Sequence, residues 1–243
     1  GGIALLQLLG MLERFEPRTL GFHSAAHVHA VCEIEKRVFA DRSEHLGDPD
    51  FHDVPVARLL AREYVQGRAK EIDLARKSDP GTVTHGPLRE REETTHFSFV
   101  DRWGNAVSNT TTLNDSYGSG IVVRGAGFLL NNEMDDFSAK PGVPNLFGVI
   151  GREANAIAPR KRMLSSMCPT FAFKEGKLWL VLGTPGGPTI FTTVFQVIVN
   201  RVDFTMTLEE AVAAPRFHHQ WPPLRKEADP ISVEKPFAAP VAE

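Results

Sequence analysis

A run of charged residues at 89–93 leads directly into two threonines and a histidine at 94–96, and a strand-like alternation of apolar and polar residues follows at 97–99. A threonine hydroxyl is a poor nucleophile unless a base removes its proton. One known solution uses the residue's own α-amino group, once the chain has been cut in front of it. An α-amine titrates at about 7.7–8.0, so a useful fraction is an unprotonated base near neutral pH. The junction between Glu93 and Thr94 meets two requirements of such a nucleophile, a strand start and a preceding flexible segment, but taken alone the tripeptide is better explained as a plain strand start.

Three further motifs carry groups that acyl chemistry could use. Gly186-Gly187 follows a proline, the stretch NNEMDDF at 131–137 is acidic, and two serines stand at 165–166. Glycine allows close backbone approach, as an oxyanion hole requires, and a carboxylate pair suits a cation. In isolation, each motif is more often a turn, an exposed loop, a cation site or a helix cap.

Two histidine pairs are candidate metal ligands. His23 and His27 have the i, i+4 spacing that can bind a metal on a helix. Ser24 is a typical N-cap residue, which places His23 outside the helix, and no third ligand is evident. The His218-His219 pair is similarly more typical of a structural role. We therefore expect no metal and no cofactor.

The composition excludes several classes of protein. The chain has 243 residues, 42% of them hydrophobic and 23% charged, with a formal net charge of −3. These values are ordinary for a soluble globular protein and give no basic surface for nucleic acid. Cys32 and Cys168 are far apart and imply no disulfide framework.

The first third of the chain is expected to be helical. We predict an apolar helix over 3–15, and a second helix capped by Ser24 with an apolar stripe over 28–38. A third helix is predicted to open with Asp53 as N-cap and Pro55 at the first helical position. Residues 73–93 then lose periodicity and gather proline, glycine and charge, which is typical of a linker.

Strand patterns dominate after the linker. Strands around the turn at 101–105 predict one hairpin, ending at residue 112, and 170–173 with 178–182 predict a second. A helix is favoured over 190–200, and Thr207 with Glu210 forms a capping box for a short helix that Pro215 ends. Helices followed by a strand-rich half indicate an α+β chain or a layered sandwich.

Seven motifs in order, and one upstream, resemble a known family. They are TTHFSFVD at 94–101, TTTLN at 110–114, GSGI at 118–121, LLNNEMDDFSAKPGVPN at 129–145, RMLSSMCPT at 162–170, GTPGG at 183–187, APRFHHQW at 214–221 and, upstream, ADRSEHLGDPDF at 40–51. Together they resemble the γ-glutamyltransferase family, the γ-glutamyl transpeptidases. The resemblance covers most of residues 1–221, and residues 222–243 match poorly.

The resemblance implies a fold and a division of the chain. The family has the N-terminal-nucleophile hydrolase fold, a four-layer αββα sandwich, and its members cut themselves into a large and a small subunit. Residues 1–93 would be the C-terminal part of the large subunit, ending in the linker at 73–93. Residues 94–243 would be a small, catalytic subunit truncated at its C-terminus, and the cut would fall between Glu93 and Thr94.

The resemblance also implies roles for single residues. Thr94 would be the nucleophile, with Thr112 and Asn114 beside it and its amine. The oxyanion hole would be Gly186 and Gly187. The remaining expected substrate contacts are Glu133 and Asp136 to the α-ammonium group, and Ser165 and Ser166 to the α-carboxylate.

This sequence also departs from the family pattern. Family members hold the α-carboxylate with an arginine from an earlier part of the large subunit, which lies outside this sequence, and we do not transfer that role to Arg152, Arg160 or Arg162. Phe147 stands where some members carry a tyrosine on a lid over the site, so the hydroxyl of that lid is lost.

The expected activity is γ-glutamyl transfer and hydrolysis, with glutathione or other γ-glutamyl compounds as donors and water, amino acids or peptides as acceptors. The alternatives are a related cephalosporin or glutaryl acylase, and a catalytically inactive fragment. The start at Gly1, without methionine or a basic flank, looks like the middle of a longer chain, so we expect an incomplete sandwich that is inactive alone. Family resemblance implies a periplasmic, secreted or membrane-anchored extracellular location.

Overall fold

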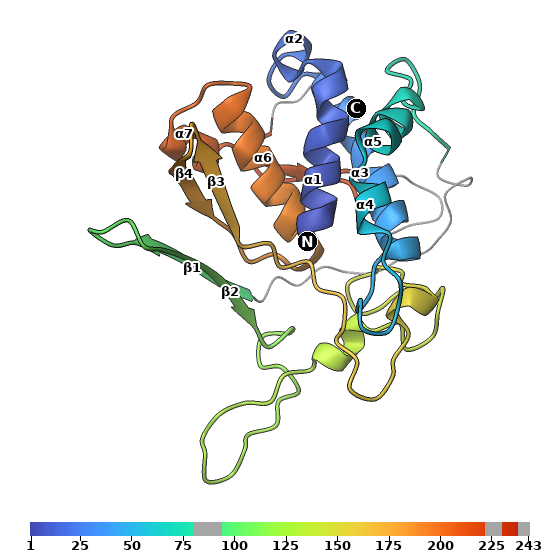
Figure 1. Cartoon of the computed structure of the whole chain (residues 1–243), viewed down its shortest axis with the longest axis vertical. Coiled ribbons are helices and arrows are strands. Elements are labelled where there is room, and N and C mark those ends of the chain that lie inside the picture. Colours follow the sequence, from blue (N-terminus) through green and yellow to red (C-terminus); the bar gives the residue numbers. More distant parts are fainter. Residues whose placement is uncertain (80–93, 222–229, 238–243) are drawn as a thin grey trace.

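The computed structural model describes residues 1–79, 94–221 and 230–237. At its centre, helix α1 (Gly2–Leu12) packs against α3 (Ala25–His45) and α6 (Ile190–Val202) (Figure 1). Two β-hairpins lie to the left of these helices, and long loops lie below them in the same view. The mixed helix and strand content predicted from the sequence is therefore present.

The first two predicted helices are confirmed with small changes at their ends. The α-helical part of α1 ends at Leu12, and a 3-10 turn, η1, covers Glu13–Phe15 before the single-turn helix α2 (Pro17–Leu20). Ser24 caps α3 as predicted, because its Oγ accepts a hydrogen bond of 3.0 Å from the backbone N–H of His27. This bond satisfies one of the N–H groups that a helix start leaves unpaired.

The predicted start of the third helix is wrong. Pro55, not Asp53, occupies the N-cap position, no side chain caps the helix, and α4 spans only Val56–Leu59. The backbone at Ala61 is extended, so the helix cannot continue, and α5 begins anew at Arg62–Lys70. Leu59 is buried in front of this break and Val65 behind it, so the break lets both helices bury an apolar side chain.

The first hairpin forms as predicted. Strand β1 (Thr94–Val100) pairs antiparallel with β2 (Ala106–Thr112), and Thr94 stands opposite Thr112. The carboxylate of Asp101 closes the turn by accepting hydrogen bonds from the backbone N–H groups of Trp103, at 2.8 Å, and Asn105, at 2.9 Å. The turn therefore fixes the register that places Thr94 at the far end of the hairpin.

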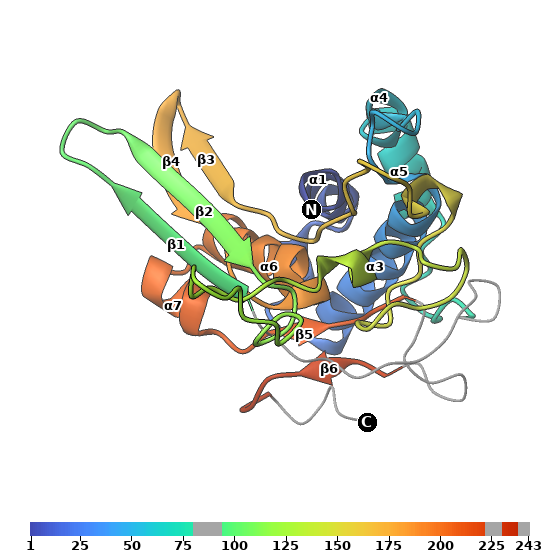
Figure 2. The same cartoon turned by 90° about the horizontal axis from the view of Figure 1, so that it is seen from below.

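The second hairpin is also confirmed. Strand β3 (Thr170–Lys174) pairs with β4 (Lys177–Leu182), and Figure 2 shows the two hairpins side by side. Between them, the Ser108 hydroxyl donates a hydrogen bond of 3.0 Å to the Leu182 carbonyl. With β5 (Phe217–His218) and β6 (Ser232–Val233), the described residues form three two-stranded sheets.

The predicted helices of the C-terminal half are present. The helix favoured over 190–200 is α6, which covers Ile190–Val202. Helix α7 (Leu208–Ala213) starts at a complete capping box between Thr207 and Glu210. Local capping chemistry therefore sets the start of α7, as the sequence indicates.

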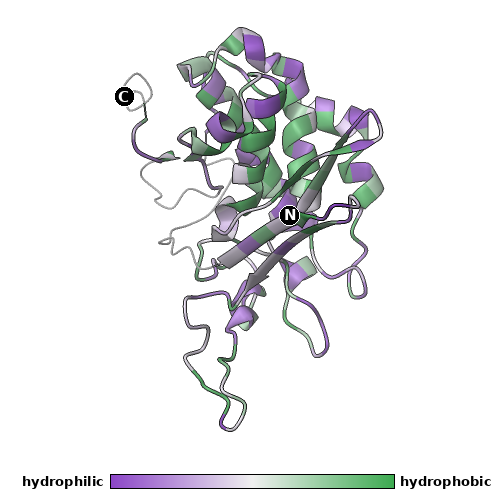
Figure 3. Cartoon of the chain, turned by 90° about the vertical axis from the view of Figure 1, so that its left-hand side faces the viewer, coloured by the Kyte–Doolittle hydropathy of each residue, from purple (hydrophilic) through white to green (hydrophobic). Residues whose placement is uncertain are grey.

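Apolar side chains of the three central helices make the core. Figure 3 shows helices with alternating hydrophobic and hydrophilic segments, as expected of elements that bury one face. Phe39 of α3 and Phe191 of α6 pack together with ring centroids 5.1 Å apart. The other core members on these helices include Leu8, Met11, Ile34, Val38, Phe195 and Val199.

Histidines 23 and 27 lie in an aromatic cluster. The ring of His23 stacks on Phe22 at 3.7 Å, and His27 accepts a hydrogen bond of 3.2 Å from the backbone N–H of His23. Among the described residues there is no group of three or more histidine, cysteine, aspartate or glutamate side chains that could hold a metal ion. Within the same ranges, no helix is both long and apolar enough to cross a membrane.

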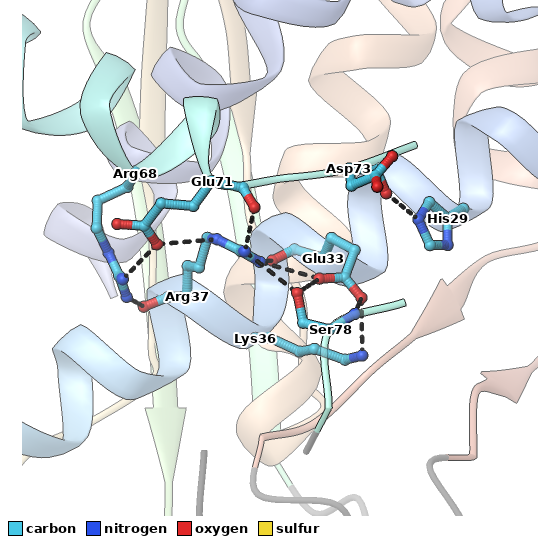
Figure 4. Close-up of polar contacts among 8 residues, drawn as sticks. All are labelled: His29, Glu33, Lys36, Arg37, Arg68, Glu71, Asp73 and Ser78. Atoms are coloured by element: carbon cyan, nitrogen blue, oxygen red, sulfur yellow. Dashed lines mark hydrogen bonds and ion pairs between the residues drawn. The ribbon is translucent and has the colours of Figure 1, made fainter. Parts of the chain in front are cut away.

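Helix α3 is unusual in burying charged residues over most of its length. Glu33 accepts hydrogen bonds from Lys36 at 2.9 Å, from Arg37 at 3.0 Å, and from the backbone and hydroxyl of Ser78 at 3.0 and 2.6 Å (Figure 4). Burial raises the pKa of Glu33, but the bonds from Ser78 and Lys36 outweigh it and lower the pKa to about 2. The carboxylate thus fixes the beginning of the linker, at Ser78, onto the helix.

Replacing Glu33 should be far more costly than replacing another glutamate of the same helix. Glu33→Ala leaves two cations and a serine without their buried partner, and we expect it to lose about 3–5 kcal/mol of unfolding free energy. Glu44 is exposed and pairs with Arg152, so Glu44→Ala should cost only about 0–1 kcal/mol. Urea unfolding of both variants measures the difference. Equal losses would show that the Glu33 network does not stabilise the fold.

Candidate active site

One pocket gathers seven of the nine residues that the sequence marks as catalytic or substrate-binding. We call it the Thr94 pocket. Of the predicted residues, it is lined by Thr94, Thr112, Asn114, Asp136, Ser165, Ser166 and Gly187. Its other lining residues are Arg42, Asn145, Phe147, Val149, Leu164, Met167, Pro188 and Ile190. The elements involved lie on both sides of the linker, so the pocket depends on the packing of the whole chain.

The hairpin places the candidate nucleophile. Thr94 begins β1, and its hydroxyl donates a hydrogen bond of 3.2 Å to the hydroxyl of Thr112 across the strand pair. Thr112 Oγ1 also accepts a bond of 2.8 Å from the backbone N–H of Asn114. Asn114 is buried, with φ at +77°, a conformation that asparagine tolerates better than most residues. The three residues thus form one short chain of hydrogen bonds. Glu93, the other half of the predicted cleavage site, lies outside the described residues.

The two glycines predicted as oxyanion donors take different positions. Gly187 lines the pocket, but Gly186 is not among the described residues that line it. Both have positive φ, +135° at Gly186 and +49° at Gly187, which a side chain would strain. A Cβ at Gly186 would also lie 2.5 Å from Thr189 Oγ1. The sequence G-G is therefore required by the backbone here, whichever N–H group faces the pocket.

The two acidic residues predicted to bind the α-ammonium group also differ in position. Asp136 and Glu133 share the 3-10 turn η3 (Glu133–Asp136), yet of the two only Asp136 lines the pocket. Burial raises the pKa of Asp136 to about 7, the Arg42 charge opposes this rise, and the carboxylates of Glu133 and Asp135 add to it. Burial also raises the pKa of Glu133. The pocket therefore holds a carboxyl group that changes charge near neutral pH.

Both predicted serines line the pocket, and the segment before them is held by a contact that lies outside the pocket. The segment before Ser165 is held by Asp48, whose carboxylate accepts hydrogen bonds from the backbone N–H of Arg162 at 2.8 Å and from its side chain. These bonds hold the pKa of Asp48 well below its usual range. The sequence alone predicts no role for Arg162, and the structure gives it this anchoring contact.

One pocket residue is absent from the sequence-based predictions. Arg42 of α3 is buried, lines the pocket and donates a hydrogen bond of 3.2 Å to the hydroxyl of Ser166. Its only signal in the sequence is its place within the motif ADRSEHLGDPDF, which by itself gives no residue a role. Phe147, the aromatic at the predicted lid position, is buried beside Gly187, where a Cβ would lie 3.5 Å from its ring.

The comparisons with known proteins agree on the class of protein. A family model described as gamma-glutamyltranspeptidase matches residues 1–243. The chain therefore belongs to the gamma-glutamyltranspeptidase family.

Particular relatives make the likeness more specific. The glutathione hydrolase proenzyme of Pseudomonas aeruginosa is 56% identical over 245 residues, which cover 100% of this chain and 43% of the relative. Among solved structures, gamma-glutamyltranspeptidase from Pseudomonas nitroreducens complexed with L-DON is 66% identical, with a TM-score of 0.52 over 52% of this chain and 66% of that one. Cephalosporin acylase from Bacillus halodurans is 26% identical, with a TM-score of 0.73 over 99% of this chain and 40% of that one. The chain thus spans less than half the length of the Pseudomonas aeruginosa relative.

The raised pKa of Asp136 predicts a pH-dependent stability. The folded protein keeps this carboxyl protonated up to about pH 7, whereas the unfolded chain releases the proton near pH 4. The group therefore destabilises the fold increasingly as the pH rises through this window. Asp136→Asn cannot ionise, so its melting temperature should exceed that of the wild type more at pH 8 than at pH 5. A difference between the two proteins that does not change with pH would contradict the raised pKa.

Proposed function

We propose that the full-length protein containing this chain carries out the γ-glutamyl transfer that its family name describes and the hydrolysis that the name of its Pseudomonas aeruginosa relative describes, with Thr94 as the nucleophile. The observation that carries the proposal is the meeting of Thr94, Asp136, the two serines and Gly187 in one pocket. These residues are far apart along the chain, and they converge in a protein whose relative from Pseudomonas aeruginosa is named glutathione hydrolase proenzyme. Each motif alone has a simpler interpretation, and their convergence supports the shared one.

In the proposed reaction, Thr94 Oγ1 attacks the γ-amide carbonyl carbon of glutathione or another γ-glutamyl compound. The free α-amine of Thr94 takes the hydroxyl proton and passes it to the leaving amine. Backbone N–H groups at Gly186 and Gly187 stabilise the oxyanion. The resulting γ-glutamyl ester on Thr94 is then cleaved by water or by an acceptor amino acid or peptide. No cofactor or metal takes part in this scheme.

The substrate's amino-acid group would be held at the opposite end of the pocket. Asp136, with Glu133 behind it, would bind the α-ammonium group, and Ser165 and Ser166 would donate to the α-carboxylate. Asp136 can bind an ammonium group well only when ionised, so substrate binding should strengthen as the pH rises through about 7. Thr112 and Asn114 would hold the nucleophile and its amine.

The proposed division of the chain follows from the same mechanism. Residues 1–93 would be the end of a large subunit and residues 94–243 a small subunit, paired after the cut, in a four-layer αββα sandwich that residues outside this chain help to form. The word proenzyme in the name of the Pseudomonas aeruginosa relative supports a maturation step. The match to Pseudomonas nitroreducens covers 52% of the chain, a share close to that of residues 94–221. We extend the proposal to a periplasmic, secreted or membrane-anchored extracellular location.

The second candidate function is that of a cephalosporin or glutaryl acylase. It is suggested by the likeness to the Bacillus halodurans cephalosporin acylase along 99% of the chain. Such acyl groups lack an α-ammonium group. A half-buried carboxylate that lines the pocket, at Asp136, favours the γ-glutamyl substrate because an ammonium group would compensate its charge.

Cleavage at Thr94 is the direct test of the proposed mechanism. The full-length protein should cut itself between Glu93 and Thr94, because the proposed mechanism uses the free α-amine of Thr94 as its base. N-terminal sequencing of the smaller product should read Thr-Thr-His-Phe, and intact mass should show two pieces. Thr94→Ala should stay uncut and inactive, with Thr95→Ala as the matched control that still cuts. A product that starts elsewhere would refute the assignment.

Substrate choice tests the role of Asp136. Removing one partner of a buried charge pair typically costs about 2–5 kcal/mol, so Asp136→Ala should lose most γ-glutamyl anilide turnover. Glutaryl anilide differs by lacking the ammonium group, and its turnover should change far less. The variant should still cleave itself, which reports on folding. Equal losses on both substrates would exclude an ammonium role.

A further inference from the structure

Arg42 lies on α3, in the part of the chain that precedes the predicted cut, yet it enters the Thr94 pocket. Only 6% of its surface is exposed. Burying a guanidinium group is costly unless hydrogen bonds and opposite charge compensate it. Its surroundings therefore show what the arginine is placed to do.

One compensating interaction is with Ser166. Arg42 Nη2 donates a hydrogen bond of 3.2 Å to Ser166 Oγ. A guanidinium group has donors only, so it occupies a lone pair of the serine oxygen and leaves the serine proton to point elsewhere. Arg42 thereby makes the Ser166 hydroxyl a donor toward the pocket, which is the role that an incoming carboxylate requires.

The other compensating interaction is electrostatic. Arg42 and Asp136 both line the pocket and their charges attract. Glu133 and Asp135 also act on Asp136 and favour its protonated form, as burial does. Among these groups Arg42 is the cation, and it keeps the pKa of Asp136 from rising further.

We propose that Arg42 is a positioning residue for the amino-acid group of the substrate: it orients the Ser166 hydroxyl toward the α-carboxylate, and its positive charge favours the ionised Asp136 carboxylate that would bind the α-ammonium group. The inference rests on the proposed function and adds a residue to it. Arg42 acts through two neighbours that contact opposite charges of one zwitterion. Arg42 is not the upstream arginine that the family resemblance implies. That arginine lies outside this sequence, whereas Arg42 lies within it and donates a hydrogen bond to Ser166.

Three anilide substrates separate the proposed effect of Arg42 on carboxylate binding by Ser166 from its proposed effect on ammonium binding by Asp136. The γ-glutamyl anilide carries both charges, glutaryl anilide lacks the ammonium group, and 4-aminobutyryl anilide lacks the carboxylate. The ratio of kcat/KM between γ-glutamyl anilide and each truncated substrate measures what each charge contributes. The measurements use the full-length, self-cleaved protein, whose cleavage and melting report folding.

In Arg42→Met, both ratios should fall, and KM for γ-glutamyl anilide should rise about 10-fold to 100-fold, as expected for losing a charge-assisted hydrogen bond. The change in kcat should be much smaller, because the reacting carbonyl lies at the other end of the substrate. The pH at which KM improves should move upward, because Asp136 then lacks its nearby cation.

Arg42→Lys separates the effect on Ser166 from the effect on Asp136, and it can replace Arg42→Met in the test if that variant fails to fold. Lysine keeps the charge but lacks the planar fork of donors. The pH transition of KM should therefore stay near that of the wild type, while the carboxylate ratio falls. The control is Arg152→Gln, because Arg152 is half-exposed and pairs with Glu44, two residues along α3 from Arg42. This control should behave as the wild type does.

The outcomes distinguish this inference from the proposed function. If the wild type does not hydrolyse γ-glutamyl anilide, the proposed function fails. If the wild type is active and the folded Arg42 variants retain both ratios and the same pH transition, only the role of Arg42 is refuted. A fall confined to the carboxylate ratio in Arg42→Met, with an unchanged pH transition, would overturn the proposed effect on Asp136 and indicate a direct carboxylate contact.

Discussion

The buried charges of helix α3 are the constraint on which the rest of the structure depends. A charged side chain removed from water must find a partner, and here the partners come from distant segments. Glu33 binds Ser78, and Glu35, whose pKa burial raises well above its usual value, accepts a hydrogen bond from the backbone of His219 at 2.7 Å. Asp41 accepts bonds from Gln7 and Arg68, and Arg42 donates to Ser166. Each contact holds a different segment of the chain against α3. This one helix therefore positions the neighbouring helices, the linker and the pocket relative to one another.

This arrangement explains why the pocket can form from such scattered pieces. The hairpin brings Thr94, the 3-10 turn η3 brings Asp136, and the segment held by Asp48 brings the serines. Polar contacts tie each piece to a different neighbour: Ser108 of the hairpin bonds to β4, Asn155 bonds to the Asp136 carbonyl, and Arg42 bonds to Ser166. Burial has a second effect: the same environment that orders Asp136 raises its pKa to about 7 and ties its charge to the pH.

Features governed by neighbouring residues could be predicted from the sequence. The Ser24 cap, the capping box at Thr207, both hairpins and helix α6 are local, and all are present. The predicted helix start at Asp53 is wrong because Pro55, with ψ at 58°, is itself the N-cap, and the residue types at 53–55 do not fix that backbone angle. Most of the expected site residues come from motifs in register, and the structure brings seven of them into one pocket. Arg42 could not be predicted because a helical arginine looks like a solvated charge until its neighbours in space are known.

The pairing of Thr94 with Thr112 has a consequence for how this sequence can vary. Side chains alternate along a strand, so a slip of one residue turns every side chain of β1 to the opposite face. The length of the turn at Asp101–Asn105, at the far end of the hairpin, sets that register. Over evolutionary time the turn can therefore exchange residues that keep its hydrogen bonds, but an insertion or deletion there that shifts the pairing by one residue would no longer place Thr94 opposite Thr112. The turn lies at the other end of the hairpin from Thr94, yet its length sets which residue of β1 pairs with Thr112.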